Sequence, residues 1–221
     1  MTEGDSLVEW ERIPRKEYSK MTSRHRPFWQ SLNAFIRSNN VSSIVEAGCG
    51  AAVLAEAVES YTGIDMNLGV LDDNNRMYGA GPRWIHSDWL SLDPTTLCAD
   101  LFLAASLIEH CRSYEAFLGH VLQIPSLKYA IVTFHKGLRD KSIMRTKKWE
   151  RDGKRGKWPD NYYCFADVHQ WLLDNVSNAH WRIYTLEHSY DWSPKRWDSV
   201  LVFDWTRNAQ LDMWEIQHVS C

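Results

Sequence analysis

The sequence predicts an α/β protein in which helices cover both faces of a mostly parallel β-sheet. Short apolar segments alternate with longer amphipathic ones, and a glycine-rich turn follows the first of the apolar segments. Near the end of the chain, two β-rich segments follow each other with only a polar loop between them. We expect this last pair to be antiparallel and to place one antiparallel strand near the edge of the sheet.

Each expected element has its own sequence pattern. A helix is expected over 26–38, because Phe28, Leu32, Phe35 and Ile36 recur at helical spacing. Residues 51–60 are rich in Ala, Leu and Glu and predict a helix after the glycine turn. Further helices are expected over 68–78, 113–124 and 165–176, and strands over 43–47, 61–65, 83–86, 100–105, 128–134, 181–187 and 199–205.

The composition is that of an ordinary globular protein and excludes a disordered, collagen-like or disulfide-rich chain. The 221 residues are 44% hydrophobic and 24% charged, with a formal net charge of −3. We expect a single domain over 1–221, with an N-terminal helical cap over 1–40 and a basic lid or insertion over 136–164.

The five cysteines form no CxxC pair, which favours a reducing, cytoplasmic location. No apolar run approaches the roughly 20 residues of a membrane span, so no membrane partner is expected.

The glycine turn and two acidic residues define a candidate nucleoside site. Gly48 and Gly50 allow a tight turn and a close approach of a ligand to the backbone. Asp65 ends the second strand, where its carboxylate can accept hydrogen bonds from both hydroxyls of a ribose. Asp88 follows the third strand, where it can accept from an adenine amino group while Trp89 covers the ring. Ligands of such sheets bind beyond the carboxyl ends of the strands, so these residues are expected to lie together.

These motifs resemble those of the small-molecule branch of class I S-adenosylmethionine-dependent methyltransferases. Val45-Glu46-Ala47-Gly48-Cys49-Gly50 is similar to the first motif of that family, and Gly63-Ile64-Asp65 is similar to its ribose-binding motif. Ser87-Asp88-Trp89 resembles the adenine-contact segment, and residues 99–110, which end in Glu109-His110, resemble the fourth motif. The resemblance covers residues 43–135, and Ala52 stands where the family has a third glycine.

The resemblance implies a three-layer, Rossmann-like sandwich with a seven-stranded sheet, and S-adenosyl-L-methionine (SAM) as cofactor. The residues that it assigns to the cofactor are Glu46, Gly48, Cys49, Gly50, Asp65, Met66, Asp88, Trp89 and Ser106. The methyl group of SAM is already electrophilic, so the protein mainly has to hold the acceptor in line with it. Only an acceptor atom with a tightly held proton needs a base, and His110, His135 and Glu109 are the candidates because they follow predicted strands.

Two other interpretations of this site remain open. A related fingerprint binds NAD, but it requires a third glycine where this chain has Val53, which makes a dehydrogenase the weaker alternative. A regulatory protein that binds SAM without catalysis would keep the same glycine turn, Asp65 and Asp88.

The histidines and cysteines show no HxxxH, HxH or CxxC spacing, so no metal is expected.

The segment 136–157 differs in charge from the rest of the chain. It holds ten basic and three acidic residues, a local net charge of +7 against −10 elsewhere. Three interpretations remain open: a lid that attracts an anionic small acceptor, a surface that holds RNA for methylation, and a solvated, mobile loop. The pI of about 6.3 and the lack of an Asn-Pro-Pro-Tyr-type motif after the fourth strand favour a small-molecule acceptor over nucleic acid. The oligomeric state is not indicated.

Overall fold

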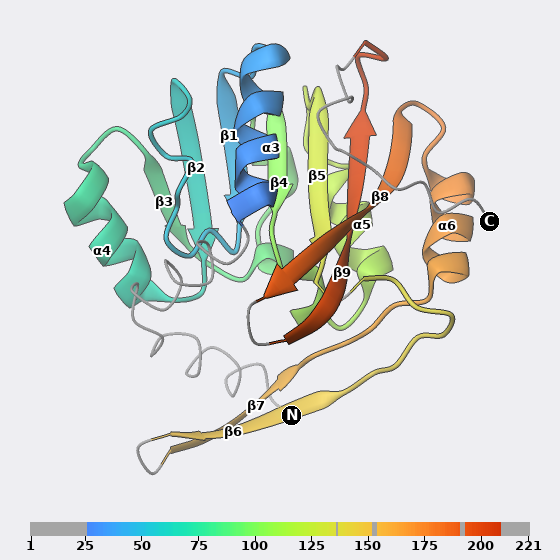
Figure 1. Ribbon diagram of the computed structural model, residues 1–221. Helices are drawn as coiled ribbons and strands as arrows, with labels where there is room; N and C mark the ends of the chain where they lie inside the picture. The colour runs from blue at the N-terminus through green and yellow to red at the C-terminus, as the bar shows by residue number, and fades with distance from the viewer. Residues whose placement is uncertain (1–25, 136, 152–153, 191–192, 209–221) are drawn as a thin grey trace.

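The computed structural model describes residues 26–135, 137–151, 154–190 and 193–208, and its centre is a seven-stranded mixed sheet (Figure 1). The strands of this sheet are β1 (Ser43–Ala47), β2 (Ser60–Asp65), β3 (Arg83–His86), β4 (Leu101–Ala104), β5 (Tyr129–Phe134), β8 (His180–Tyr190) and β9 (Ser193–Asp204). Their order across the sheet is β3-β2-β1-β4-β5-β9-β8. Neighbours are parallel except where β9 pairs with β5 and with β8. The expected fold class, with an antiparallel strand next to the sheet edge, is therefore confirmed.

Helices on both faces of the sheet complete three layers. One face carries α3 (Arg26–Ser38) and α4 (Leu68–Tyr78), and the other carries α5 (Tyr114–Val121) and α6 (Phe165–Asn175). Figure 1 shows α3 in front of the central strands and α5 behind them. The helices expected at these four places are confirmed. The part of the expected N-terminal cap before residue 26 lies outside the described residues.

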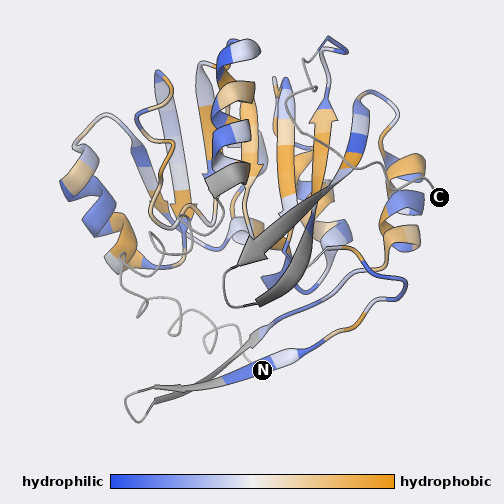
Figure 2. Cartoon of the chain, in the orientation of Figure 1, coloured by the Kyte–Doolittle hydropathy of each residue, from blue (hydrophilic) through white to orange (hydrophobic). Residues whose placement is uncertain are grey.

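Alternation along the central strands divides the hydrophobic core into two parts. In β4, Leu101 and Leu103 belong to the part that contains α3, whereas Phe102 and Ala104 belong to the part that contains α5. Because the central strands are covered on both faces, nearly all of their residues are apolar, as the hydropathy colours of β4 and β5 show (Figure 2). Within the described ranges, no helix combines the length and the apolar character that crossing a bilayer requires.

The connection from β1 to β2 differs from its sequence-based prediction. The helix predicted over 51–60 is replaced by tight turns, held by hydrogen bonds from the N–H groups of Ala52, Ala55 and Ala57 to the carbonyls three residues earlier. Residues 48–59 connect the two strands, which is about the minimum of a dozen residues for a parallel crossover. The first of these residues form the glycine turn. We infer that the remaining residues are too few for a regular helix that packs on the sheet, so tight turns take its place.

The basic segment after β5 forms a two-stranded arm outside the main sheet. In this β6–β7 arm, β6 (Thr146–Arg151) pairs in antiparallel register with β7 (Lys154–Pro159). Figure 1 shows the arm extending below the sheet, on the side where β2 ends. This part of the chain is thus a hairpin, and its role as a lid stays a prediction. Lys136, residues 152–153 and the side chains of 149–158 lie outside the described residues.

Candidate functional site

The turn after β1 places two glycines, which carry no side chain, at the carboxyl-terminal edge of the sheet. Gly48 and Gly50 have φ angles of +67° and +47°, left-handed values that glycine adopts most readily. The N–H groups of Gly48 and Cys49 donate to the Ile64 carbonyl at 2.8 and 3.1 Å, which fixes the turn to the end of β2. A Cβ at Gly48 would come within 3.2 Å of the Leu107 side chain, so the turn also lies against the loop after β4.

Asp65 at the end of β2 holds this turn through its carboxylate. Its Oδ2 accepts the N–H of Gly50 and its Oδ1 accepts the N–H of Asn67, both at 2.9 Å. Asp65 is 8% exposed, and burial raises its pKa, while the backbone N–H groups of Gly50, Asn67 and Met66 oppose that shift. A carboxylate has about four acceptor directions, so Asp65 retains capacity for a further donor, such as a hydroxyl group.

Glu46 lies in the interior, two residues before the turn. The hydroxyl of Tyr61 donates to its Oε2, and only 2% of the residue is exposed. The pKa of Glu46 is raised to about 8, mainly by burial and to a smaller extent by the charge of Asp65, against the lowering effect of the Tyr61 hydrogen bond. Glu46 is therefore mostly protonated at pH 7, and a cation placed beside it would favour the ionised form.

Burial also raises the pKa of the Cys49 thiol, so this cysteine is not a thiolate nucleophile.

The ends of β2 and β3 place Asp88 near Asp65. The N–H of Ser87 donates to the Asp65 carbonyl at 3.1 Å, which brings the residue before Asp88 to the end of β2. Asp88 is half-buried, and its Oδ1 accepts the Leu90 N–H at 3.1 Å. Met66, which directly follows Asp65, is also half-buried.

Trp89 packs into the core on the α5 face. It is 3% exposed, and its ring centroid lies 4.8 Å from that of Phe102 and 4.7 Å from that of His120. This packing holds in place the short turn that carries Asp88. The expected role of Trp89 as a cover over a ligand ring stays a prediction.

The loop after β4 carries Ser106, Glu109 and His110. Ser106 has a φ of +56°, and its N–H donates to the hydroxyl of Thr133 on β5 at 2.7 Å. Glu109 is 4% exposed, and His110 is half-buried. The Nδ1 of His110 lies 2.8 Å from the Pro159 carbonyl. Because a carbonyl only accepts, Nδ1 carries the proton in this contact, and the lone pair of the neutral ring is on Nε2.

His135 directly follows β5 and so lies at the same edge. Its Nδ1 is 3.4 Å from Oδ1 of Asp198 on β9. Asp198 is 5% exposed, so its carboxylate lies beside the imidazole and is shielded from water. All three predicted acid–base residues therefore follow the ends of β4 and β5.

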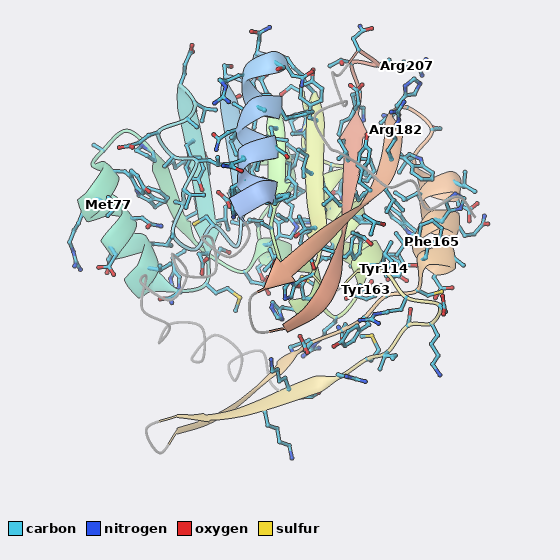
Figure 3. The ribbon with its side chains drawn as sticks, in the orientation of Figure 1. Met77, Tyr114, Tyr163, Phe165, Arg182 and Arg207 are labelled. Carbon is cyan, nitrogen blue, oxygen red and sulfur yellow. The ribbon has the colours of Figure 1, made fainter. Side chains whose placement is uncertain are left out.

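Asn161 joins the loop after β4 to the root of the β6–β7 arm. Its N–H donates to the Glu109 carbonyl at 2.9 Å, and its Nδ2 donates to the Cys111 carbonyl at 2.8 Å. Its Oδ1 accepts the Arg145 N–H at 3.1 Å. The Tyr163 hydroxyl adds a bond to the Cys111 carbonyl at 2.9 Å, and Figure 3 shows Tyr163 where the arm meets the sheet. The arm and the loop after β4 thus form one hydrogen-bonded unit.

Sequence reasoning missed several polar residues that hold these loops. Asn67 caps α4, and Asn74 on the same helix donates to the Gly50 carbonyl at 2.7 Å. The place of Asn67, just before an amphipathic helix, is a capping signal that the sequence does carry. Asn161 and Asp198 have no comparable signal, because their partners are distant in the chain.

A hollow of about 380 Å³ lies at the opposite end of the sheet. It is lined by residues 40–42 and 56–59, which precede β1 and β2. The hollow is therefore separate from the candidate site at the carboxyl-terminal edge.

In the part of the chain that the structure describes, no group of three or more histidine, cysteine or acidic residues is arranged to hold a metal ion.

The fold is shared with solved structures that include SAM-dependent methyltransferases. DhpI in complex with SAM and HEP matches with a TM-score of 0.64 and 14% identity, over 91% of this chain and 99% of that one. A SAM-dependent methyltransferase from Leishmania major matches with a TM-score of 0.64 and 11% identity, over 91% and 82% of the two chains. The methyltransferase domain of bacterial CtHen1 matches with a TM-score of 0.57 and 14% identity, over 81% and 98%. No protein-family model matches the sequence, and no curated protein matches it. The comparisons establish that this chain has the fold of SAM-dependent methyltransferases.

Proposed function

We propose that this protein is a SAM-dependent methyltransferase that acts on a small, anionic acceptor. The observation that carries the proposal is the hydrogen bond from the Gly50 N–H to the Asp65 carboxylate. It joins the glycine turn after one strand to a fixed acid at the end of the next, at the sheet edge where nucleotides bind in open α/β folds. DhpI, which was solved with SAM, has the same fold.

The residues at this edge fit the nucleoside part of SAM. Gly48 and Gly50 carry no Cβ and adopt left-handed backbone angles, so a ligand can approach the backbone closely at these two positions. Asp65 retains acceptor capacity for the ribose hydroxyls, and half-buried Asp88 would accept from an amino group of the base. Glu46 would become ionised beside the ammonium group of the cofactor. The remaining residues proposed for this pocket are Cys49, Met66 and Ser106, while Trp89 supports it from the core. When bound, SAM would supply a methyl group on a positively charged sulfur.

Glu109, His110 and His135 form the proposed acceptor end. The Nε2 lone pair of His110 is suited to take a proton from an acceptor hydroxyl or amine, and His135, which lies beside Asp198, is the alternative base. Proton transfer to a positioned histidine typically contributes about 10²–10⁴-fold in rate. Holding the acceptor in line can contribute about 7–11 kcal/mol, so positioning is the larger effect.

Calorimetric titration of the full chain with SAM and S-adenosylhomocysteine tests the cofactor proposal, and we expect micromolar binding. The informative variant is Asp88→Ala, with Asp93→Ala as its matched control. Both aspartates cap a short turn by accepting the N–H two residues later, at 3.1 and 2.9 Å. Asp88 lies two residues after the end of β3, whereas Asp93 lies seven residues after it. We expect Asp88→Ala to weaken binding about tenfold or more, as for a hydrogen bond to a charged group, and Asp93→Ala to leave it unchanged.

A folded wild-type protein that binds neither compound would contradict the proposal. Equal losses in Asp88→Ala and Asp93→Ala would show that a damaged turn, not a lost contact, weakens binding. Asp65→Asn is expected to abolish binding as well. Because the Asp65 carboxylate also holds Gly50 and Asn67, that result counts only if the melting temperature of the variant stays close to that of the wild type.

A further inference from the structure

We propose that Arg139, Arg145 and Tyr162 form an oxyanion-binding site at the root of the β6–β7 arm, which holds the charged group of the acceptor. The acceptor role rests on the proposed methyl transfer, whereas the binding of an anion does not. The ligand chemistry is a phosphate or carboxylate group.

Both guanidinium groups lie over the ring of Tyr162. The Cζ of Arg139 is 5.2 Å from the ring centroid, and the Cζ of Arg145 is 5.0 Å from it. The two cations are therefore within about 10 Å of each other, and both side chains belong to exposed residues. The attraction of two cations at this separation for the same anion adds. A guanidinium also presents a planar set of N–H donors that matches a phosphate or carboxylate, with the aromatic ring as a support.

The backbone places the two arginines on the same face as Tyr162. Ile143 pairs directly with Tyr162, through reciprocal hydrogen bonds of 2.8 and 2.9 Å, and Arg145 follows Ile143 by two residues. Arg139 forms a bridge with Cys164, which follows Tyr162 by two residues. Since residues two apart in an extended segment share a face, the pairing brings both arginines to one ring from separate places in the chain.

Cations outnumber acids in the stretch of chain that carries these arginines. Between residues 139 and 148 the exposed cations are Arg139, Lys141, Arg145, Lys147 and Lys148, and the nearby acids are Asp140, Asp160 and Asp167. Asp167 already accepts a hydrogen bond from the Ser142 hydroxyl at 3.2 Å. The positive excess favours an anionic ligand and raises its local concentration.

The same hydrogen bonds fix this site relative to the proposed acceptor end. Arg145 donates its N–H to Asn161 Oδ1, and Asn161 donates its own N–H to the Glu109 carbonyl. The side chain of His110 contacts the Pro159 carbonyl nearby. The His110 side chain and the Arg145 backbone are therefore both tied to the short segment 159–161. An anion held by Arg145 would therefore keep a defined position relative to His110, as positioning of an acceptor requires.

The experiment is a calorimetric titration of the full chain with pyrophosphate at low salt, repeated with saturating S-adenosylhomocysteine. The informative variant is Arg139→Gln/Arg145→Gln. Its matched control is Lys141→Gln/Lys148→Gln, which removes the same charge from exposed residues of the same stretch. We expect the arginine variant to weaken pyrophosphate binding at least tenfold and the lysine variant to weaken it less than twofold. The affinity for S-adenosylhomocysteine should not change in either variant.

A fluorescein-labelled twelve-nucleotide oligouridylate distinguishes a small oxyanion from a nucleic-acid backbone. We expect its binding, measured by fluorescence anisotropy, to be weak and to fall equally in the two variants, because diffuse attraction depends on total charge. Tighter binding of the oligonucleotide than of pyrophosphate, lost only in the arginine variant, would overturn the small-acceptor assignment.

The outcomes also separate this inference from the cofactor proposal. Binding of S-adenosylhomocysteine without binding of pyrophosphate would overturn the oxyanion site and leave the cofactor site in place. Equal loss of pyrophosphate binding in the two variants would likewise overturn a discrete site. Binding of pyrophosphate that depends on the two arginines, in a protein that does not bind S-adenosylhomocysteine, would support the oxyanion site and remove its catalytic role.

Discussion

The two halves of the carboxyl-terminal sheet edge are built in different ways. At the ends of β1 to β3, the proposed donor half, the main contact joins Gly50 to Asp65, 15 residues apart in the chain. In the proposed acceptor half, at the ends of β4 and β5 and the part of β9 beside them, His110 contacts Pro159 across 49 residues, and Leu138 contacts Ser199 across 61. The donor half is therefore formed within neighbouring strand units, whereas the acceptor half needs distant parts of the chain. We expect the donor half to lose stability when its packing is disturbed. We expect the acceptor half to lose stability and ligand binding when its long-range hydrogen bonds are removed.

The largest effect is expected at Gly63, in the middle of β2. A Cβ there would lie 2.7 Å from the Trp84 ring and 2.9 Å from the Cys49 sulfur. Overpacking of this kind typically destabilises by about 1–3 kcal/mol, and with a rigid ring as neighbour we expect Gly63→Ala to reach about 2–3 kcal/mol. The corresponding fall in melting temperature is roughly 5–10 °C, measurable by circular dichroism. A fall below about 2 °C would show that the donor half is not tightly packed.

Asn161 tests whether hydrogen bonds hold the acceptor half. Asn161→Ala removes the acceptor of the Arg145 N–H and one of the two side-chain donors to the Cys111 carbonyl, which keeps the Tyr163 hydroxyl. This is expected to lower the unfolding free energy by about 1–2 kcal/mol. Pyrophosphate binding should weaken, while S-adenosylhomocysteine binding should stay within twofold of the wild type. Asn175→Ala is the control, because its side chain makes one exposed bond, to the Trp171 carbonyl. If both ligands lose affinity equally, the two halves are not independent.

Glu46 gives the donor half a pH dependence of its own. Burial raises its pKa from 4.5 to about 8, so the folded protein holds this proton more tightly than the unfolded chain does. The resulting stabilisation is fully present below about pH 4.5 and is lost as the pH rises through about 8. Glu46→Gln is neutral at every pH and can still accept from Tyr61. We expect urea unfolding to show the wild type losing at least about 1 kcal/mol relative to Glu46→Gln between pH 5 and pH 8. Parallel pH profiles for the two proteins would refute this assignment.

The smallest effect is expected on the α5 face, away from both halves of the site. No atom lies within 4 Å of a Cβ added at Gly119, which is inside α5. Gly119→Ala should therefore stabilise the protein by about 0.5–1 kcal/mol through helix propensity, the opposite sign to Gly63→Ala. Binding of S-adenosylhomocysteine and of pyrophosphate should not change. Destabilisation would mean that α5 packs more tightly than its contacts indicate.

Most of the fold could be predicted from the sequence because its elements have strong periodic patterns. The apolar runs of β4 and β5 and the amphipathic spacing of α3 are local properties, and the structure confirms them. The helix predicted over 51–60 is absent because helix propensity is local, whereas the number of residues that the connection needs depends on how β1 and β2 pair. Ala52 shows the same limit: it takes a φ of +51° although its residue type favours a helix.

The sequence by itself determined the order of the elements and the glycine turn with Asp65 and Asp88, because strand, turn and acid follow one another in a short stretch. Only the tertiary structure decided that Glu46 is buried against Tyr61, that Asp198 lies beside His135, and that two arginines meet over Tyr162. These contacts depend on which strands become neighbours and on how a distant segment packs at their ends. Such pairings are set by the free energy of the whole packed sheet, and no local pattern of residues encodes them.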